Sequence, residues 1–154
     1  MLSQLLKSHC LPLAATFCLF AQGASAKTCE LSIEGNDAMQ YNTKELTVAK
    51  DCTDVKVTLK HVGKLPKAAM GHNFTLTAEK DMQAVITAGM QAGLPADYLP
   101  KDDARIIAST KVVGGGETAT TSFKMAQLKP GETYKYFCTF PGHSAVMNGT
   151  LVIK

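Results

Sequence analysis

The sequence predicts an all-β fold, a β-sandwich that one short helix interrupts. After residue 26, short runs with apolar residues at every second position alternate with turns rich in Gly, Pro, Asn and Asp, which is the pattern of an antiparallel sandwich. Apolar residues recur at three and four positions around residues 79–91, which indicates a helical insertion there. The chain has 154 residues, so it is long enough for a domain with its own core. Its formal net charge is +3.

The clearest predicted strand begins at Val55. Its apolar side chains alternate with polar ones through Leu59, and the period of two places His61 on the same inward side. The triple glycine at 114–116 is expected to form a turn, because no helix follows it and it lacks the other residues of a phosphate loop. Further strands are expected near 31–33, 46–48, 74–77, 105–113, 118–123, 133–138 and 150–154.

The first 26 residues have the features of a secretory signal peptide. Lys7 precedes an apolar run over 11–21 that is too short to span a bilayer, and Ala24-Ser25-Ala26 forms a cleavage signal of small residues. We therefore expect a cleaved signal at 1–26 and a single exported domain at 27–154, with no membrane association after cleavage. The basic residues are scattered among acidic ones, which argues against a nucleic-acid partner.

Three cysteines remain after residue 26: Cys29, Cys52 and Cys138. In an oxidising compartment two of the three should pair. Cys29 and Cys52 have no histidine close by in the sequence, and a structural disulfide between them fits, with a contribution of roughly 3 kcal/mol to stability. Cys138 is then a thiol that is either reactive or bound to a metal.

One loop near the C-terminus carries three soft metal ligands. Cys138, His143 and Met147 are spaced four or five residues apart, and Pro141-Gly142 lets the backbone turn so that they converge. His72, just before a predicted strand, is the plausible fourth donor. Each of these residues alone is more often a packed core residue. Coordination explains all four together, including the unpaired thiol.

The predicted ligand set favours copper over zinc. A thioether is a poor zinc ligand, whereas two imidazoles and a thiolate in one plane with a weak axial methionine are typical of copper sites that carry single electrons. Such a site has no strong open position for a substrate. We therefore expect an electron-transfer protein and not an enzyme, with a copper-buffering or copper-delivery protein as the alternative. A delivery protein would surrender copper readily to a chelator.

The sequence resembles the azurins, a family of small blue copper proteins among the cupredoxins. The resemblance covers essentially all of 27–154 and is strongest over 137–145, with further similarity at 35–40, 65–66, 70–73, 81–83 and 97–98. It implies a Greek-key β-sandwich with a disulfide between Cys29 and Cys52. Many azurins also have a core tryptophan in the neighbourhood of Phe74, and a histidine linked to pH response that corresponds to His61. An inward histidine on an apolar strand is more often simply packed and hydrogen-bonded, and this is the interpretation we favour for His61.

The resemblance also implies roles for individual residues of the copper site. His72, Cys138 and His143 would be the in-plane ligands and Met147 the axial one. The Gly71 carbonyl would be a second, weaker axial contact, and the backbone N–H groups of Asn73 and Phe140 would donate to the cysteine sulfur.

The neighbours of His143 are unusually apolar for a surface loop, which indicates a docking surface for redox proteins. We expect partners such as c-type cytochromes or periplasmic reductases and dehydrogenases. The loop itself contributes Phe140, Pro141, Ala145 and Val146, and the resemblance adds Met39, Leu65, Met70 and Met90.

Export should remove residues 1–26, because Ala24-Ser25-Ala26 is the only good cleavage signal after the apolar run. The exported protein is expected to begin at Lys27 and to lie in the periplasm. Intact-mass measurement of periplasmic material checks this expectation. A product that retained Cys10 or carried a lipid would contradict it.

Overall fold

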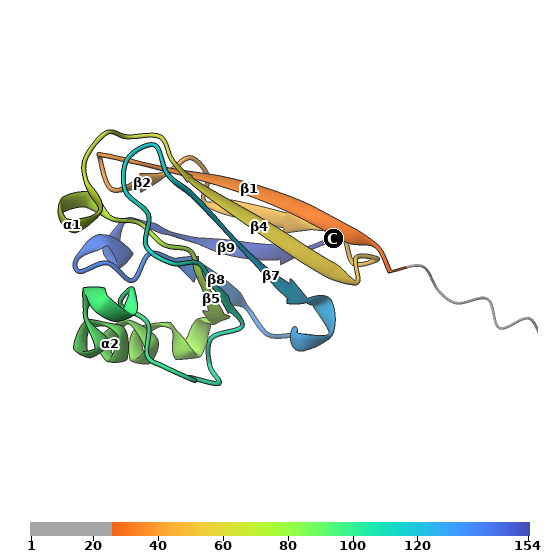
Figure 1. The fold of residues 1–154 in the computed structure, drawn as a ribbon. Coiled ribbons are helices and arrows are strands. Elements are labelled where there is room, and N and C mark those ends of the chain that lie inside the picture. The colour runs from red at the N-terminus through yellow and green to blue at the C-terminus, as the bar shows by residue number, and fades with distance from the viewer. Residues whose placement is uncertain (1–25) are drawn as a thin grey trace, which may run out of the picture.

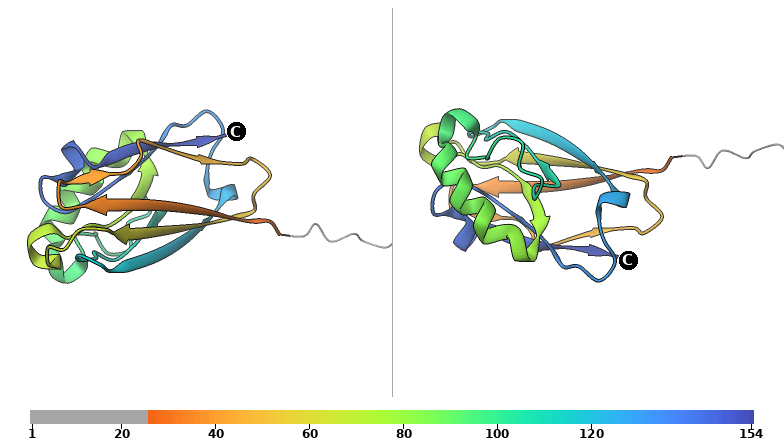
Figure 2. Two further views of the ribbon diagram at one scale, coloured as in Figure 1. Left: turned by 90° about the horizontal axis from the view of Figure 1, so that it is seen from above. Right: turned by 90° about the horizontal axis from the view of Figure 1, so that it is seen from below.

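The structure is a computed structural model that describes residues 26–154, and two β-sheets lie face to face in it (Figures 1 and 2). One sheet has the strand order β2-β1-β4-β7 and the other β3-β9-β8-β5-β6. The predicted β-sandwich is therefore confirmed. The expected signal peptide lies outside the described residues, except for Ala26.

The elements follow one another without long gaps. The strands are β1 (Thr28–Asn36), β2 (Gln40–Tyr41), β3 (Glu45–Val48), β4 (Asp54–His61), β5 (Thr75–Ala78), β6 (Ala108–Ser109), β7 (Thr118–Lys124), β8 (Tyr134–Phe137) and β9 (Asn148–Ile153). The helices are α1 (Lys67–Met70) and α2 (Met82–Ala92), with short 3₁₀ turns η1 (Glu79–Asp81), η2 (Leu94–Ala96), η3 (Met125–Gln127) and η4 (His143–Ala145).

The alternation in β4 positions the core as the sequence predicts. The side chains of Val55, Val57 and Leu59 are fully buried, and so is His61 in phase with them. They face the inner side of the second sheet, where Phe74 and Tyr136 stack with ring centroids 5.8 Å apart. Phe74 therefore occupies the core position expected for it.

Not all strand pairs are antiparallel, which differs from the expected pattern. β1 runs parallel to β4, and β3 runs parallel to β9. The cause is the crossover between the sheets: the chain leaves the first sheet after β2, forms β3 in the other sheet and returns for β4. The predicted disulfide between Cys29 and Cys52 is present, with Cα atoms 5.8 Å apart, and it joins β1 to the segment that leads into β4.

The strand expected over 105–113 is much shorter in the structure. The pairing there is limited to β6 with β5 and to one isolated bridge between Val113 and His72. A longer strand does not form, because Arg105 is held in a turn by Asp103 and the backbone N–H of Val112 donates to a side chain of Asp97. The four-residue helix α1 also has no counterpart in the prediction, since its length is too short to display a helical period.

Helix α2 confirms the predicted helical insertion and covers one face of the five-stranded sheet (Figures 1 and 2). Val85 and Ile86 pack against Phe137 of β8, away from the main core. The helix ends at Gly93, whose φ of 72° suits glycine. Within residues 26–154, no helix has the length and apolar character needed to cross a membrane.

Candidate metal centre

The loop between β8 and β9 holds three of the four expected ligands. Its two ends are fastened together, because the N–H of Cys138 donates to the carbonyl of Met147 over 3.0 Å. Gly142 turns the backbone with a φ of 80°, and η4 follows at once. Within η4 the carbonyl of His143 accepts the N–H of Met147 at 2.7 Å. The hydrogen bonds therefore fold the loop so that its sulfur and nitrogen ligands lie on one side.

The fourth expected ligand is delivered by a separate part of the chain. Two backbone hydrogen bonds of 2.9 and 2.8 Å with Val113 fix the backbone of His72. Its side-chain Nε2 lies 2.8 Å from the carbonyl of Asn36. A carbonyl only accepts, so Nε2 carries the proton and Nδ1 is left with its lone pair free for a metal.

The two segments meet in a buried cluster of three ligand atoms. Nδ1 of His72 lies 3.2 Å from Nδ1 of His143, and Sγ of Cys138 lies 3.7 Å from the same His143 nitrogen. All three ligand atoms lie within 4.8 Å of one another. Sγ is also 3.9 Å from the Gly71 carbonyl. Residues 71 positions apart in sequence thus bring a thiol and two imidazoles to one point.

Met147 is fully buried beside this cluster. Gly35 is a close neighbour of both Met147 and His72. A Cβ added to this glycine would lie 3.3 Å from the terminal methyl carbon of Met147 and 2.8 Å from Cδ2 of His72. Gly35 therefore leaves the space in which the side chains of Met147 and His72 fit together. Nothing in the sequence pattern distinguishes this role from that of an ordinary turn glycine.

The protonation states of the cluster suit a soft metal. Burial lowers the pKa of His143 to about 4, with the neighbouring His72 contributing, and burial also lowers the pKa of His72. Both rings are therefore neutral at physiological pH, as ligands must be. Burial raises the pKa of the Cys138 thiol to about 12, although the N–H groups of Asn73 and Phe140 donate to its sulfur and favour the thiolate. A bound cation is what would stabilise a thiolate in this interior.

Asn73 joins the histidine segment to the ligand loop through its side chain. Its Oδ1 accepts the N–H of Thr139 at 2.8 Å, and its Nδ2 donates to the Thr139 hydroxyl at 2.6 Å. The same Nδ2 lies 3.1 Å from the Asp97 carbonyl. The family resemblance implies the backbone N–H of Asn73 as a neighbour of the sulfur, but not these side-chain bonds. The carbonyl of Asn36 was likewise missed, since a backbone acceptor has no residue signature.

His61 lies directly behind the site. Its ring stacks on His72 with centroids 4.3 Å apart and an interplanar angle of 13°. Its Nδ1 accepts the N–H of Gly63 at 3.0 Å, while Nε2 lies 2.8 Å from the Met70 carbonyl. The inward position predicted for His61 is confirmed, and the structure adds that both ring nitrogens are hydrogen-bonded.

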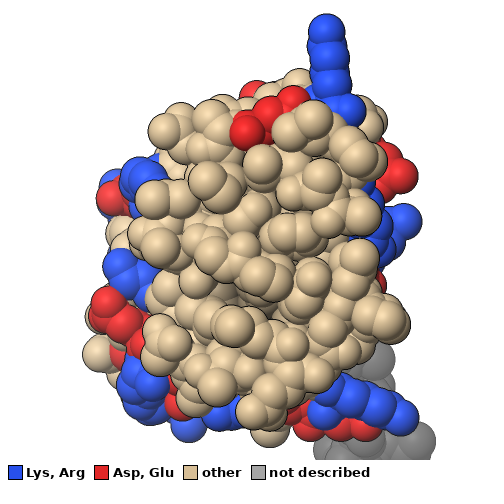
Figure 3. Space-filling model, turned by 90° about the vertical axis from the view of Figure 1, so that its left-hand side faces the viewer, with Lys and Arg blue, Asp and Glu red and all other residues tan. Residues whose placement is uncertain are grey.

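The end of the molecule that carries α1 and the ligand loop is largely free of charged side chains (Figure 3). His143 is 3% exposed there and packs against Phe140, with ring centroids 4.7 Å apart. Large apolar side chains exposed on the segments at this end include Met39, Val62, Leu65, Met90 and Val146. Four other residues were expected in the docking surface. Of these, Pro141 and Ala145 are exposed, Met70 is half-buried and Phe140 is buried.

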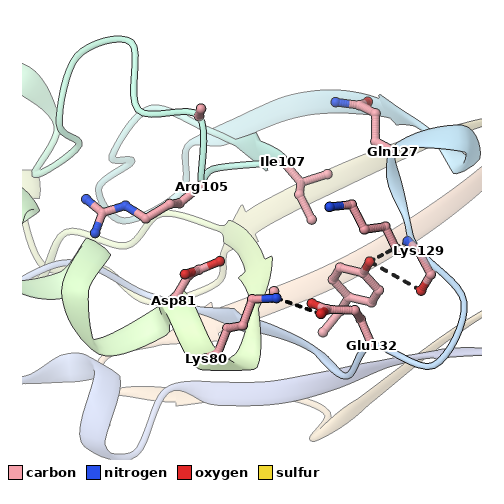
Figure 4. A pocket seen from close by; sticks show the side chains of 10 residues that line it. Lys80, Asp81, Arg105, Ile107, Gln127, Lys129 and Glu132 are labelled. Atoms are coloured by element: carbon pink, nitrogen blue, oxygen red, sulfur yellow. Dashed lines mark hydrogen bonds and ion pairs between the residues drawn. The ribbon is translucent and has the colours of Figure 1, made fainter.

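A surface hollow lies away from the ligand cluster, between η1 and the turn before β8 (Figure 4). Its charged side chains are largely paired: Lys80 lies 2.6 Å from Glu132, and Arg105 pairs with Asp103. Among the residues that line it there is no histidine, cysteine or methionine. This hollow therefore has no soft metal ligand and is not a second copper site.

Comparison with known proteins gives the same assignment along the chain. The family model for copper binding proteins of the plastocyanin/azurin family matches residues 27–154. The azurin of Achromobacter denitrificans is 55% identical over 144 residues, which cover 91% of this chain and 97% of that protein. The azurin of Pseudomonas aeruginosa strain PAO1 is 53% identical over 129 residues, or 84% and 87% of the two chains. The expected resemblance is confirmed.

Replacing Gly35 by Ala should disturb the metal centre while preserving the sandwich. The new methyl would stand 2.8 Å from a His72 ring that cannot move freely, because Asn36 and His61 hold it. We expect weaker copper binding and an altered visible spectrum, measured by copper titration and absorption. Ser32→Ala, at an exposed position of the same strand, is the matched control. Equal spectra for both variants would show that the space at Gly35 is not needed.

Proposed function

Because the chain belongs to the plastocyanin/azurin family of copper-binding proteins, we propose that it carries single electrons through one copper ion held by His72, Cys138 and His143. Met147 would add a weak axial ligand, and the Gly71 carbonyl a second, weaker contact. The observation that supports this assignment most directly is the buried convergence of a thiol and two neutral imidazoles within 4.8 Å.

The donor set determines which metal fits. A thiolate with two imidazoles and a thioether matches copper, which accepts soft sulfur ligands, better than zinc, magnesium or calcium. Copper, when bound, supplies a one-electron change between Cu(I) and Cu(II). The residues of the chain hold its ligands in place: Asn36 fixes the ring of His72, and Asn73 fixes the ligand loop through Thr139.

Burial and rigidity support electron transfer over copper delivery. His72, Cys138 and Met147 are fully buried, so a chelator or a receiving protein has no direct access to them. Hydrogen bonds hold the ligand side chains and their loop from several directions. Ligands that are already positioned need little rearrangement when the oxidation state changes. A delivery protein would need exposed or mobile ligands instead.

The proposed location rests on the N-terminal segment of the chain, and the proposed partners rest on the apolar end of the molecule. Residues 1–26 act as an export signal and 27–154 form the functional domain in the periplasm, where an internal disulfide can form. Electrons leave and enter at the apolar end around His143, through brief contacts with periplasmic redox proteins such as c-type cytochromes, reductases or dehydrogenases. An uncharged surface suits such weak contacts, because both partners can lose water there at low cost.

Replacing Cys138 by Ser should abolish the intense blue colour of the copper-loaded protein, because that absorption arises from charge transfer between sulfur and copper. Met147→Leu should keep the colour and shift the reduction potential, since the axial ligand tunes such sites. Absorption spectra and voltammetry measure the two effects. If Met147→Leu bleached the protein as fully as Cys138→Ser, the assignment of in-plane and axial ligands would be wrong.

Replacing Met70 by Lys should slow electron self-exchange and reaction with a c-type cytochrome by about tenfold or more, because desolvating an unpaired charge at a contact costs at least about 1.4 kcal/mol. The blue spectrum should not change. Thr120→Lys, on an exposed position of β7, adds the same charge away from the apolar end and serves as control. If the stopped-flow rates fell equally in both variants, or in neither, electrons would leave the protein by a face other than the apolar end around His143.

A further inference from the structure

Asn73 depends on a tyrosine from the opposite sheet. The hydroxyl of Tyr41 donates to the Asn73 carbonyl over 2.5 Å, and no other residue within 26–154 donates a hydrogen bond to that oxygen. Tyr41 belongs to β2, which lies in the β2-β1-β4-β7 sheet, whereas Asn73 leads into β5 of the other sheet. The phenol therefore spans the interior of the sandwich and ends at the residue that joins the two ligand segments.

The hydrogen bond is buried at both ends. Tyr41 is 5% exposed and Asn73 is fully buried, so water does not replace the phenol if it is removed. A buried carbonyl without a donor is costly. The Tyr41 hydroxyl therefore restrains the backbone of Asn73 in one orientation, and this restraint acts next to the N–H that Asn73 directs at the sulfur of Cys138.

We propose that Tyr41 is a positioning residue for the copper thiolate, acting through the backbone of Asn73. This inference rests on the proposed electron-transfer function and deepens it. The N–H of Asn73 withdraws electron density from the sulfur when it points at Sγ. A restraint that keeps it there makes the thiolate a weaker donor and favours Cu(I), the form with less positive charge, over Cu(II).

The phenol is suited to this role under all ordinary conditions. Burial raises the pKa of Tyr41 well above its usual value, and the nearby Cys138 and Tyr136 contribute in the same direction. Tyr41 therefore remains a neutral donor across the pH range in which the protein works. A side chain that lost its proton there would turn from donor to acceptor and repel the Asn73 carbonyl.

Tyr136 offers a matched comparison within the same core. It is fully buried, its hydroxyl donates to a backbone carbonyl, that of Thr43, at 2.8 Å, and its ring lies 5.7 Å from that of Tyr41. Tyr136→Phe therefore removes the same atom from the same region and leaves another backbone carbonyl without its phenol donor. It differs from Tyr41→Phe in two respects: the Thr43 bond is only partly buried, and Thr43 is not bonded to the copper ligands.

The experiment compares wild type, Tyr41→Phe and Tyr136→Phe. In the copper-free proteins, hydrogen exchange at the Asn73 amide should become faster in Tyr41→Phe than in Tyr136→Phe, while both variants unfold at lower temperature than wild type. After copper loading, Tyr41→Phe should show a lower reduction potential and a visible band moved to longer wavelength. Tyr136→Phe should keep the wild-type potential and band.

Three results would overturn the inference: an unchanged potential and band in Tyr41→Phe, equal changes in both variants, or a Tyr41→Phe chain that no longer folds, because the hydroxyl would then serve stability alone. These results are separate from failure of the proposed function. If wild-type protein took up no copper or gave no reversible redox wave, the function itself would be wrong. A blue, reversible wild type with an unaffected Tyr41→Phe would refute only the role of Tyr41.

Discussion

The structure depends on one constraint: a thiol, two imidazoles and a thioether must meet in a buried space although they come from two distant segments. Such groups lose water when the protein folds, and the loss is offset only if every remaining polar atom has a partner. Two sets of hydrogen bonds meet this requirement. The side-chain amide of Asn73 bonds to Thr139, and the N–H of Cys138 closes the loop with a 3.0 Å bond to the Met147 carbonyl. Their geometry fixes the distance between the two segments.

The same constraint explains why the two sheets cannot be considered separately from the site. The first sheet supplies the Asn36 carbonyl for His72, the gap at Gly35 and the hydroxyl of Tyr41. The second sheet supplies the strands that enter and leave the ligand loop. A relative shift of the sheets would therefore change the copper ligands directly. The disulfide between Cys29 and Cys52 lies far along β1 from Gly35 and ties β1 to the segment that crosses from β3 to β4.

Sequence alone predicts the parts of this structure that repeat or that need particular atoms. Period-two alternation identifies β4, the helical period identifies α2, and soft ligands on one turn identify the copper loop. The parallel pairing of β1 with β4 was not predicted, because it depends on which sheet the chain enters between them. The strand expected over 105–113 was too long, since Asp103 and Asp97 compete for its backbone donors. The roles of Asn36 and Tyr41 have no local pattern at all.

In the proposed function, a buried copper ion stays within reach of a redox partner because the His143 ring lies closer to the surface than the other expected ligands. His143 is 3% exposed, and Phe140 packs beside it within the ligand loop. The other expected ligands are fully buried, and the ring of His72 is held by the Asn36 carbonyl. In the proposed function, apolar residues around His143 would keep water out of a contact with a partner, whereas charged residues would hold water in place. Rigidity would then come from the buried side of the site and access from the His143 side.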